Sequence, residues 1–553
     1  MTNKRILIVG GVAGGASCAA RARRLSEEAE IVIFDRGSFV SFANCGLPYY
    51  VGSVIADEKK LLVANEDLFR NRFNIQVRLE HEAIAIDRSA RILKVKNLRS
   101  GEILEEPYDA LVLSPGASPI RPPLPGIDLP GIFALRTIPD SRRIREWIDL
   151  HRVKQAVIVG GGFIGLEMTE NLANRGIAVT LLEKLPQVMP PFDPEMMVSV
   201  HAHLRERGVK LCLGDGVKSF ERVSDDRLAV LTEAGEHHEA EMVILAIGVR
   251  PETALAKEAG LELGDRGGIR VNSRMQTGDP NIWAVGDAVE VRDWITGEWT
   301  LIPLAGPANR QGRIAADVIC GRDSDFRGVQ GTAVCSIFEL VVASTGASEK
   351  TLRRSGLDYR KVYLHPGHHA GYFPGAEPID IKLLYAPADG RVLGAQAVGK
   401  EGTEKRIDVI AMAIQAGLTV FDLEEAELCY APQFGAAKDP VNFAGMIAAN
   451  AARGDSPIVY WEDLELGRVT LLDAREVAEF DRGHVAGALN IPLSELRRRM
   501  DEIPLDRPVW TYCQVGQRGY YATRALRQRG FDAYNLTGGI KTYYAMREIG
   551  ATI

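Results

Sequence analysis

The sequence has no Cys-x-x-Cys pair and no group of histidines and cysteines at the spacing of a zinc site, although it contains seven cysteines. We therefore expect neither a dithiol redox motif nor a metal centre. No apolar run approaches the ~20 residues that span a bilayer. The formal net charge of -7 gives no electrostatic reason to expect nucleic acid or a membrane as partner. These absences favour a cytoplasmic protein in a reducing compartment.

The chain is also too long for a single hydrophobic core. At 553 residues, a prior of ~150 residues per domain predicts three or four domains. Hydrophobic residues make up 46% of the sequence and charged residues 25%, which is typical of a globular protein in water. The first residues lead directly into an apolar strand, 5–9, so we expect no signal peptide.

A glycine-rich turn follows that strand. A helix to about Leu25 and a second strand, 30–34, come next, and Asp35 closes the unit. In a dinucleotide-binding unit the glycines make the turn, the first N–H groups of the helix face the pyrophosphate, and the carboxylate binds ribose hydroxyls. Val12 replaces the usual middle glycine. The turn consists of Gly10, Gly11, Val12, Ala13, Gly14 and Gly15.

A second unit of the same kind has the complete glycine pattern. Strands are predicted at 156–159 and 178–182, and Glu183 closes the unit. Two units predict two dinucleotides, one a bound redox carrier and the other its exchangeable electron source. Glu183 should repel a 2′-phosphate and so favour NADH over NADPH, a preference that Lys184 moderates. The turn consists of Gly160, Gly161, Gly162, Phe163, Ile164 and Gly165.

Three further segments indicate that the first dinucleotide is FAD. Two glycine turns follow the strands 110–113 and 242–245, and segment 281–288 is typical of a second FAD motif. A helix from about 305 to 319 would place its positive N-terminus near the reduced flavin. The residues expected at the FAD site in these segments and beside the first unit are Arg36, Asn44, Ser114, Pro115, Gly116, Gly248, Gly286, Asp287, Pro303, Leu304 and Ala305.

Cys45 stands alone in Ser41-Phe42-Ala43-Asn44-Cys45, with no second cysteine near it in sequence. A lone thiol beside a redox cofactor can cycle only by forming a mixed disulfide or persulfide with an external sulfur. Because the thiolate is the reactive form, we expect a lowered pKa for Cys45. Residues 1 to about 450 resemble the pyridine nucleotide–disulfide oxidoreductases, specifically the coenzyme A-disulfide reductase branch with one active-site cysteine.

This resemblance implies an α/β protein with two Rossmann-like domains and an α+β dimerisation domain. The FAD-binding domain would comprise 1–117 and 246–325, the NAD(P)H-binding domain 118–245, and the dimerisation domain 326–448. In the last of these we expect strands at 334–345 and 380–385 and an amphipathic helix over 401–417.

The resemblance also implies a homodimer whose active site is shared between subunits. Tyr372 and Tyr430 are the counterparts of two tyrosines that the partner subunit contributes near the cysteine, where they can donate a proton. Near Asn309 the family usually has a histidine that contacts substrate, and this sequence lacks it. The residues implied to contact coenzyme A are Ser17, Arg21, Arg24, Ser41, Asn44 and Lys438.

The C-terminal part of the chain resembles a single-domain rhodanese over 463–553, after a linker at 449–462. A strand at 509–512 leads to Cys513 at the start of a helix. Backbone N–H groups and the helix N-terminus would stabilise a thiolate or persulfide there, and Arg518 would attract an anionic sulfur donor.

Together these features predict an FAD-dependent NAD(P)H persulfide or polysulfide reductase. Coenzyme A would carry the sulfur as a thiol, and sulfide would be released. Cys513 would load the outer sulfur and Cys45 would receive it. The alternatives are a coenzyme A-disulfide reductase, an NADH oxidase, and a redox-sensing or sulfur-delivery module in which the flavin domain gates the rhodanese.

Overall fold

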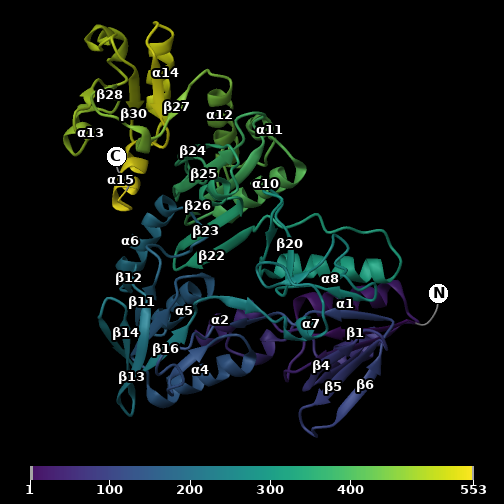
Figure 1. Ribbon diagram of the computed structural model, residues 1–553. Helices are drawn as coiled ribbons and strands as arrows, with labels where there is room; N and C mark the ends of the chain where they lie inside the picture. The colour runs from purple at the N-terminus through teal and green to yellow at the C-terminus, as the bar shows by residue number, and fades with distance from the viewer. Residues whose placement is uncertain (1–3, 551–553) are drawn as a thin grey trace. The chain divides into compact units, whose positions relative to one another are not determined.

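The computed structural model describes residues 4–550 and divides into two compact units (Figure 1). The first unit holds the chain up to Val188 together with Gly208–Val329, and the second holds Met189–Arg207 together with Gln330–Ile553. Residues 1–3 of the expected FAD-binding domain and 551–553 of the expected rhodanese domain lie outside the described residues.

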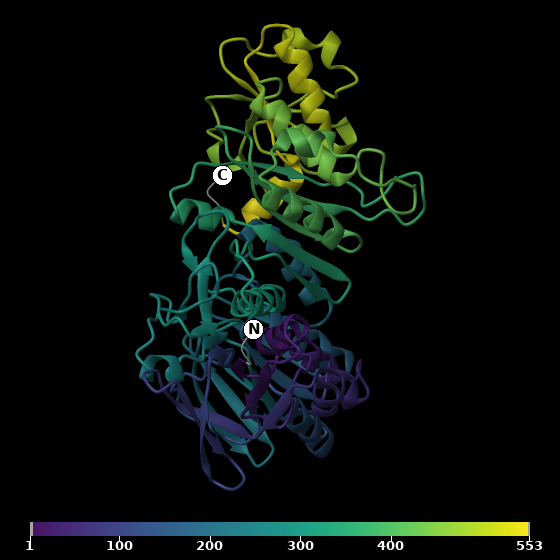
Figure 2. The same ribbon diagram turned by 90° about the vertical axis from the view of Figure 1, so that its right-hand side faces the viewer.

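The first Rossmann-like sheet is fully parallel, in the order β19-β7-β1-β2-β3. Helices α1 (Ala13–Leu25) and α8 (Ala305–Ile319) lie side by side and are seen nearly end-on in Figure 2. A Cβ on Gly312 would lie 2.2 Å from the Gly14 carbonyl oxygen, so glycine lets the two helix backbones touch. The strands are β1 (Arg5–Val9), β2 (Glu30–Asp35), β3 (Gln76–Leu79), β7 (Ala110–Leu113) and β19 (Ile282–Ala284).

The second sheet is also parallel, in the order β12-β11-β10-β16-β9. Helix α5 (Phe163–Asn174) follows its glycine turn and α4 (Ile138–His151) precedes β10. Its strands are β9 (Ile132–Ala134), β10 (Gln155–Val159), β11 (Ala178–Glu183), β12 (Lys210–Leu213) and β16 (Met242–Leu245). The two crossovers pair with each other as β8 (Ala117–Pro119) and β17 (Val249–Pro251).

Three smaller sheets also belong to the first unit. One antiparallel sheet is formed by β4 (His81–Asp87), β5 (Ile92–Asn97) and β6 (Ile103–Pro107), and another by β13 (Val217–Ser224), β14 (Arg227–Thr232) and β15 (His237–Ala240). The third is mixed and consists of β18 (Ile269–Arg270), β20 (Val289–Arg292) and β21 (Trp299–Thr300).

An antiparallel sheet in the order β22-β23-β26-β25-β24 opens the second unit after residue 330. The prediction of a single strand over 334–345 is wrong: β22 and β23 form a hairpin, with Ile337 paired to Leu340. Phe338 takes a left-handed conformation (φ 53°) at the turn, which a sequence without glycine or asparagine there does not suggest. The strands are β22 (Ala333–Ile337), β23 (Leu340–Gly346), β24 (Arg360–Leu364), β25 (Ile379–Tyr385) and β26 (Val392–Gly399).

Four helices accompany this sheet. They are α9 (Glu349–Arg354), α10 (Thr403–Ala416), α11 (Val420–Glu425) and α12 (Pro440–Ala452). The predicted helix over 401–417 is confirmed as α10, with Gly417 in the left-handed conformation that ends it.

The remaining chain forms a parallel sheet in the order β27-β31-β30-β28-β29. Its strands are β27 (Ile458–Val459), β28 (Thr470–Asp473), β29 (Leu489–Asn490), β30 (Val509–Tyr512) and β31 (Ala533–Leu536). Its helices are α13 (Val477–Asp481), α14 (Gln517–Arg527) and α15 (Gly539–Glu548). Trp461 is buried in its core.

The segment expected to be a linker is more ordered than its composition suggests. Helix α12 continues to Ala452, because alanine is the strongest helix former, and β27 already pairs with β31. Only residues 453–457 lie between the two elements.

The segment Met189–Arg207 belongs to the second unit, although the sequence predicts it in the NAD(P)H-binding domain. Within Met189–Arg207, the short helix η3 (Pro194–Met197) and α6 (Val198–Glu206) belong to this unit. Asp193 and Glu195 form buried ion pairs with Lys382 of β25, which accounts for this placement. Within residues 4–550, none of the helices combines the length and the apolar character needed to traverse a bilayer.

Candidate functional site

In both glycine turns, several positions are packed so tightly that a side chain would not fit there. A Cβ on Gly10 would lie 2.1 Å from the Ser114 carbonyl oxygen, and one on Gly15 only 1.9 Å from the Gly10 carbonyl oxygen. The second turn repeats this: a Cβ on Gly165 would lie 1.9 Å from the Gly160 carbonyl oxygen. Each helix therefore begins directly against the preceding strand, which is the geometry that a dinucleotide-binding turn requires.

The two acidic residues that close the units bind the turns. Gly11 N donates to Asp35 Oδ2 at 2.8 Å, and Gly161 N donates to Glu183 Oε2 at 2.7 Å. The second oxygen of each carboxylate accepts another backbone N–H, from Gly37 and Leu185 respectively. The carboxylates thus hold the turns in place and, with two lone pairs on each oxygen, still have acceptor capacity for ribose hydroxyls.

The helix N-termini at the turns are open to a ligand. Neither α1 nor α5 has a side-chain cap or an acidic residue in its first turn. A Cβ on Gly162 would meet nothing within 4 Å. The unpaired N–H groups of such termini fit the pyrophosphate of a dinucleotide.

The other residues expected around FAD lie in turns of the first unit. Gly116 (φ 74°) and Gly248 (φ 106°) have backbone conformations that favour glycine, and Arg36 is exposed. Asn44 Oδ1 is buried with no hydrogen-bond partner in the protein, as expected of a group that binds a polar ligand atom. Helix α8 begins at Ala305 without a side-chain cap, as expected for the flavin-facing helix.

Segment 281–288, the expected second FAD motif, carries a partly buried carboxyl, Asp287. Gly286 N donates to Gln311 Oε1 at 2.7 Å, which fixes the turn before Asp287. Burial raises the pKa of Asp287, and the positive charge of Arg136 offsets only part of this effect. The site fits FAD: a glycine turn, an open helix N-terminus and an unpaired buried amide oxygen belong to one unit.

Cys45 lies in a short helical turn, η1 (Asn44–Gly46), that continues into α2 (Leu47–Val51). The residue is exposed. The prediction of a lowered pKa is wrong as far as the groups of the protein itself are concerned, because they shift the pKa in the opposite direction. Partial burial of the thiol and the negative charges of Glu167 and Asp287 raise the pKa of Cys45. A thiolate at this position therefore needs positive charge or hydrogen-bond donors from beyond these groups.

Helix α2 packs on α5, so the element that carries Cys45 rests on the helix of the second nucleotide turn. Arg175 Nη1 donates to the Val51 carbonyl oxygen at 3.1 Å. Gly52 allows the close approach, since a Cβ there would lie 2.0 Å from Asn171 Oδ1.

The sequence did not reveal Glu167 as a functional residue. It lies on α5, where burial and the nearby charge of Glu170 raise its pKa to about 7, although a hydrogen bond with Tyr49 has the opposite effect. A carboxyl that titrates near neutral pH beside the reactive thiol can exchange protons there. No motif signals it, because its environment comes from the packing of α2 on α5.

The residues implied to contact coenzyme A are not all free. Arg21 Nε donates to Asp317 Oδ1 at 2.7 Å, an ion pair that a phosphate would have to displace. Ser17 Oγ donates to Asn309 Oδ1. Arg24 and Lys438 are exposed and take part in no ion pair within residues 4–550, so both remain available to a phosphate.

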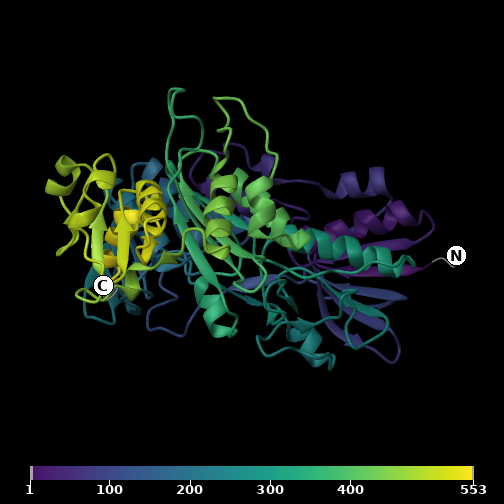
Figure 3. The same cartoon turned by 90° about the horizontal axis from the view of Figure 1, so that it is seen from above.

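The two tyrosines come together in the second unit. Tyr372 Oη and Tyr430 Oη lie 2.5 Å apart, and the side chains are 75% and 47% exposed. They belong to loops 365–378 and 426–439, which project side by side in Figure 3. The hydrogen bond to Tyr430 raises the pKa of Tyr372, so this hydroxyl stays protonated at neutral pH and can act as a proton donor.

Cys513 lies between β30 and α14, in a loop built around its sulfur. The residue is 1% exposed, and Gly516 N approaches its Sγ at 3.2 Å. Gly516 has φ 96°, a backbone conformation that favours glycine. Ile540 N donates to the Cys513 carbonyl oxygen at 2.8 Å, which ties the loop to α15.

Arg518 is held beside this loop by a two-pronged ion pair. Its Nη1 and Nη2 donate to Glu479 Oε2 and Oε1 at 2.6 and 2.7 Å. The hydrogen bond with Arg518 lowers the pKa of Glu479 to about 2, so the carboxylate stays charged. The charge of Cys513 also contributes to the raised pKa of Arg518, which places the guanidinium near the sulfur.

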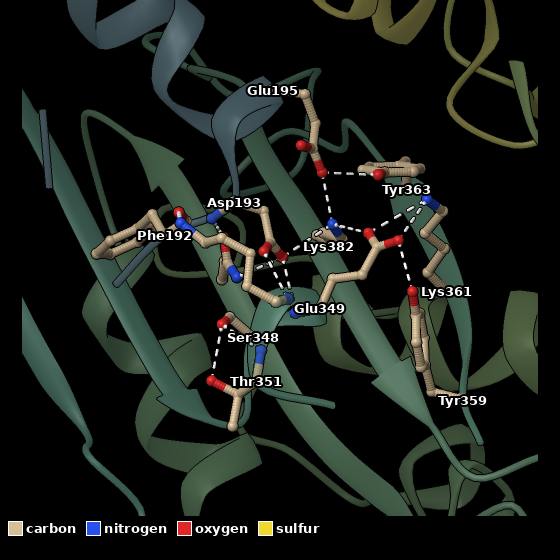
Figure 4. A network of polar contacts seen from close by, with 12 residues as sticks. Phe192, Asp193, Glu195, Ser348, Glu349, Thr351, Tyr359, Lys361, Tyr363 and Lys382 are labelled. Atoms are coloured by element: carbon tan, nitrogen blue, oxygen red, sulfur yellow. Dashed lines mark hydrogen bonds and ion pairs between the residues drawn. The ribbon is translucent and has the colours of Figure 1, made fainter. Parts of the chain in front are cut away.

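Sequence reasoning also missed a buried network of charges in the second unit (Figure 4). Lys382 Nζ contacts three carboxylates: Asp193 Oδ2 at 2.9 Å, Glu195 Oε1 at 2.5 Å and Glu349 Oε2 at 2.6 Å. Burial alone would raise the pKa of Glu349, but the charges of Lys382 and Lys361 outweigh it and hold the pKa well below its usual range. These residues are far apart in sequence, so no local motif could indicate the network.

Comparisons with known proteins agree with this arrangement. The family model of the pyridine nucleotide-disulphide oxidoreductases matches residues 4–312, its dimerisation-domain model matches 332–439, and a rhodanese-like model matches 456–546. The coenzyme A disulfide reductase of Staphylococcus haemolyticus is 35% identical over 443 residues, which is 80% of this chain and 98% of that protein.

Two solved structures cover almost the whole chain. Reduced Bacillus anthracis CoADR-RHD is 47% identical, with a TM-score of 0.97 over 99% of both chains. A NAD-dependent persulfide reductase from A. fulgidus is 36% identical, with a TM-score of 0.90 over 98% of this chain and 100% of that chain. The predicted fold class is thereby confirmed. The chain belongs to the pyridine nucleotide-disulphide oxidoreductases, flavoprotein enzymes that use FAD and NAD(P)H, and it carries a C-terminal rhodanese-like domain.

Proposed function

We propose that this protein is an NADH-dependent persulfide reductase that uses coenzyme A as its thiol carrier. The observation that carries the proposal is the presence of two different sulfur sites in one chain. Cys45 is exposed and unpartnered within the nucleotide-binding unit, whereas Cys513 is buried in a sulfurtransferase-type loop. A coenzyme A-disulfide reductase has no need of the second site.

The overall reaction balances as follows. Coenzyme A persulfide, RS–SH, reacts with NADH and one proton to give RSH, H₂S and NAD⁺. The Cys45 thiolate attacks the inner sulfur, which forms a Cys45–S–S–R mixed disulfide and releases HS⁻. A bound FAD would supply the redox chemistry that passes the two electrons of NADH to this disulfide and so allows its cleavage. The cleavage returns Cys45 as thiolate and releases RS⁻, which takes up a proton.

The protein's own residues handle the protons in this scheme. The Tyr372–Tyr430 pair, supplied by the partner subunit of a homodimer, donates a proton to the departing thiolate. Glu167, with a pKa of about 7, exchanges protons near Cys45. Because partial burial and the protein's own charges raise the pKa of Cys45, the bound flavin and substrate must supply the stabilisation that the thiolate needs.

Cys513 loads sulfur in this proposal. It takes the outer sulfur from an anionic donor that Arg518 attracts, and the donor leaves with one sulfur atom fewer. The thiol of coenzyme A then accepts that sulfur from the Cys513 persulfide. The coenzyme A contacts would come from Ser17, Arg21, Arg24, Ser41, Asn44 and Lys438. Apart from residues 189–207 and the segment 449–462, the domain boundaries expected from the sequence remain part of the proposal.

The test compares two cysteine variants. We expect Cys45→Ser to abolish NADH oxidation with both coenzyme A persulfide and coenzyme A disulfide. We expect Cys513→Ser to retain both activities but to lose sulfide release from a bulk donor such as polysulfide. Cys429→Ser, which removes another exposed cysteine, serves as control. Equal effects of Cys45→Ser and Cys513→Ser on every substrate would contradict the division of labour.

The second candidate, a coenzyme A-disulfide reductase, is favoured by the relatives of that name. Steady-state kinetics decide between the two. A kcat/KM for coenzyme A persulfide at least as high as that for coenzyme A disulfide, with one sulfide released per NADH, supports persulfide reduction. A single turnover per flavin would instead favour a sulfur-delivery or sensing module.

A further inference from the structure

The sulfurtransferase loop is supported from outside its own domain. Strand β24 is the edge strand of the antiparallel sheet that opens the second unit after residue 330, so one of its edges has no strand partner. The rhodanese-like domain covers this edge: Thr537 Oγ1 accepts from Tyr363 N at 2.9 Å, and Tyr460 Oη accepts from Lys361 N at 3.1 Å. Thr537 Oγ1 also lies 3.4 Å from the Tyr363 carbonyl oxygen.

The turn after Thr537 connects this edge to the sulfur. Gly538 and Gly539 have φ values of 75° and 64°. A Cβ on Gly538 would lie 2.7 Å from the Cβ of Tyr363. A Cβ on Gly539 would lie 2.4 Å from the Cys513 carbonyl oxygen. The turn is therefore clamped between β24 on one side and the cysteine loop on the other.

The loop's N–H groups lie against the same turn. The Cβ position of Gly539 is 2.7 Å from Gly516 N and 2.8 Å from Val515 N. Gly516 N is the donor that approaches Cys513 Sγ. A shift of the turn would consequently move the backbone donors that stabilise negative charge on the sulfur.

Tyr363 is itself fixed on its other side by the buried network. Its hydroxyl donates to Glu195 Oε1 at 2.7 Å, and Lys382 Nζ lies 5.4 Å from the centre of its ring. Tyr363 is 4% exposed (Figure 4). Since Lys382 pairs with Glu195, the network and the edge strand form one rigid support behind the turn.

We propose that Tyr363 and Thr537 are positioning residues for sulfur transfer, which make β24 part of the Cys513 site. The inference rests on the proposed function only in taking Cys513 as the sulfur-carrying residue. It implies that the rhodanese-like domain works while docked on the neighbouring sheet, because leaving β24 would release the turn that orders the loop.

Thr537→Val tests this by removing the hydroxyl at nearly constant volume. We expect kcat for sulfur transfer from thiosulfate to cyanide to fall about tenfold, with a smaller change in KM, because displaced donors stabilise the transition state less. The pH dependence of Cys513 alkylation, read by mass on its peptide, should shift to higher pH. Thr537→Ser, which keeps the hydroxyl, should restore both.

Tyr460→Phe is the matched control. Tyr460 Oη accepts from Lys361 N at 3.1 Å, so this variant also removes one hydroxyl that accepts from a β24 N–H group, but not the hydroxyl that precedes the Gly538–Gly539 turn. We expect this variant to transfer sulfur at nearly the wild-type rate. A Thr537→Val enzyme that matches wild type or Tyr460→Phe in both rate and pH profile would overturn the proposal.

If Thr537→Val does not fold, Tyr363→Phe decides, since it removes only the bond to Glu195. We expect the same two changes in smaller measure, and their absence would refute the positioning role. Failure of the proposed function is separable: a chain that never reduces coenzyme A persulfide with NADH can still show the Thr537 effect with thiosulfate and cyanide.

Discussion

The hydroxyl oxygens of Tyr372 and Tyr430 lie 2.5 Å apart although 58 residues separate them in sequence. Both side chains are exposed, so burial does not force them together. The contact between the two hydroxyls therefore depends on the conformations of the two loops and not on packing in a hydrophobic core.

Removing both hydroxyls should slow disulfide cleavage. We expect the double variant Tyr372→Phe/Tyr430→Phe to lose about 100-fold in kcat with coenzyme A disulfide, because general acid catalysis contributes on this scale. Flavin reduction by NADH in a single turnover should not change. Tyr544→Phe, at another exposed tyrosine, provides the control, and a double variant with full kcat would exclude a catalytic role for the pair.

Glu167 should govern the reactivity of Cys45 with pH. Its carboxylate, ionised above about pH 7, disfavours the thiolate, so Glu167→Gln should lower the pKa of Cys45. The pH profile of Cys45 alkylation by iodoacetamide would then shift to lower pH. Glu28→Gln, at an exposed position, should leave the profile in place. An unchanged profile in Glu167→Gln would show that burial and Asp287 set the pKa of Cys45 without a contribution from Glu167.

The ion pair between Arg518 and Glu479 should matter for donor binding. Glu479→Gln leaves the guanidinium without its two-pronged partner, so we expect KM for thiosulfate to rise about threefold, the scale of a partly exposed pair. The matched control is Glu502→Gln, which breaks a similar pair with Arg499 on the same domain. Equal KM values in the two variants would argue against a role for the pair in donor binding.

Lys382 should be a strong determinant of stability. Lys382→Met leaves three buried carboxylates without their common cation, and we expect a loss of about 3–5 kcal/mol at pH 7 by denaturant unfolding. Lys400→Met is the control, because Lys400 forms an exposed ion pair with Glu377. We expect this variant to lose less than about 1 kcal/mol in the free energy of unfolding.

The sign of its pH dependence follows from Glu349. Its folded-state pKa lies below the unfolded value, so its stabilising contribution is present above about pH 4.3 and is lost as pH falls through the folded pKa. In Lys382→Met the carboxylates bind protons more readily. The deficit relative to wild type should therefore shrink between pH 7 and pH 5, and a deficit independent of pH would contradict this assignment.

The nucleotide turns and the Cys513 loop could be predicted because their signals are local. Close backbone contacts require glycine at positions 10, 15 and 165, and these contacts involve residues a few positions away or the end of a neighbouring strand. Strand β30 ends at Tyr512, as its sequence predicts, and so places Cys513 at the start of the loop. A helix N-terminus beside such a turn follows from backbone geometry alone.

The remaining features depend on partners that are distant in sequence. Lys382 and Glu195 are 187 residues apart, and no periodicity links them. The pKa of Cys45 could not be derived from its motif, because it depends on Glu167 of α5, which packing brings near. The hairpin turn at Phe338 escaped prediction because an aromatic residue occupies a conformation that usually signals glycine or asparagine.

The chain passes between the compact units after Val188, after Arg207 and after Val329. The second unit is therefore encoded by two separate stretches of the sequence and cannot be produced as one continuous fragment. A fragment that starts at Gln330 would contain Lys382 and the sulfur loop but would lack Asp193 and Glu195, two of the carboxylates that neutralise this lysine. Recombination that exchanged only the rhodanese-like domain would still depend on residues 189–207, because this segment of the second unit is encoded between two parts of the nucleotide-binding sequence.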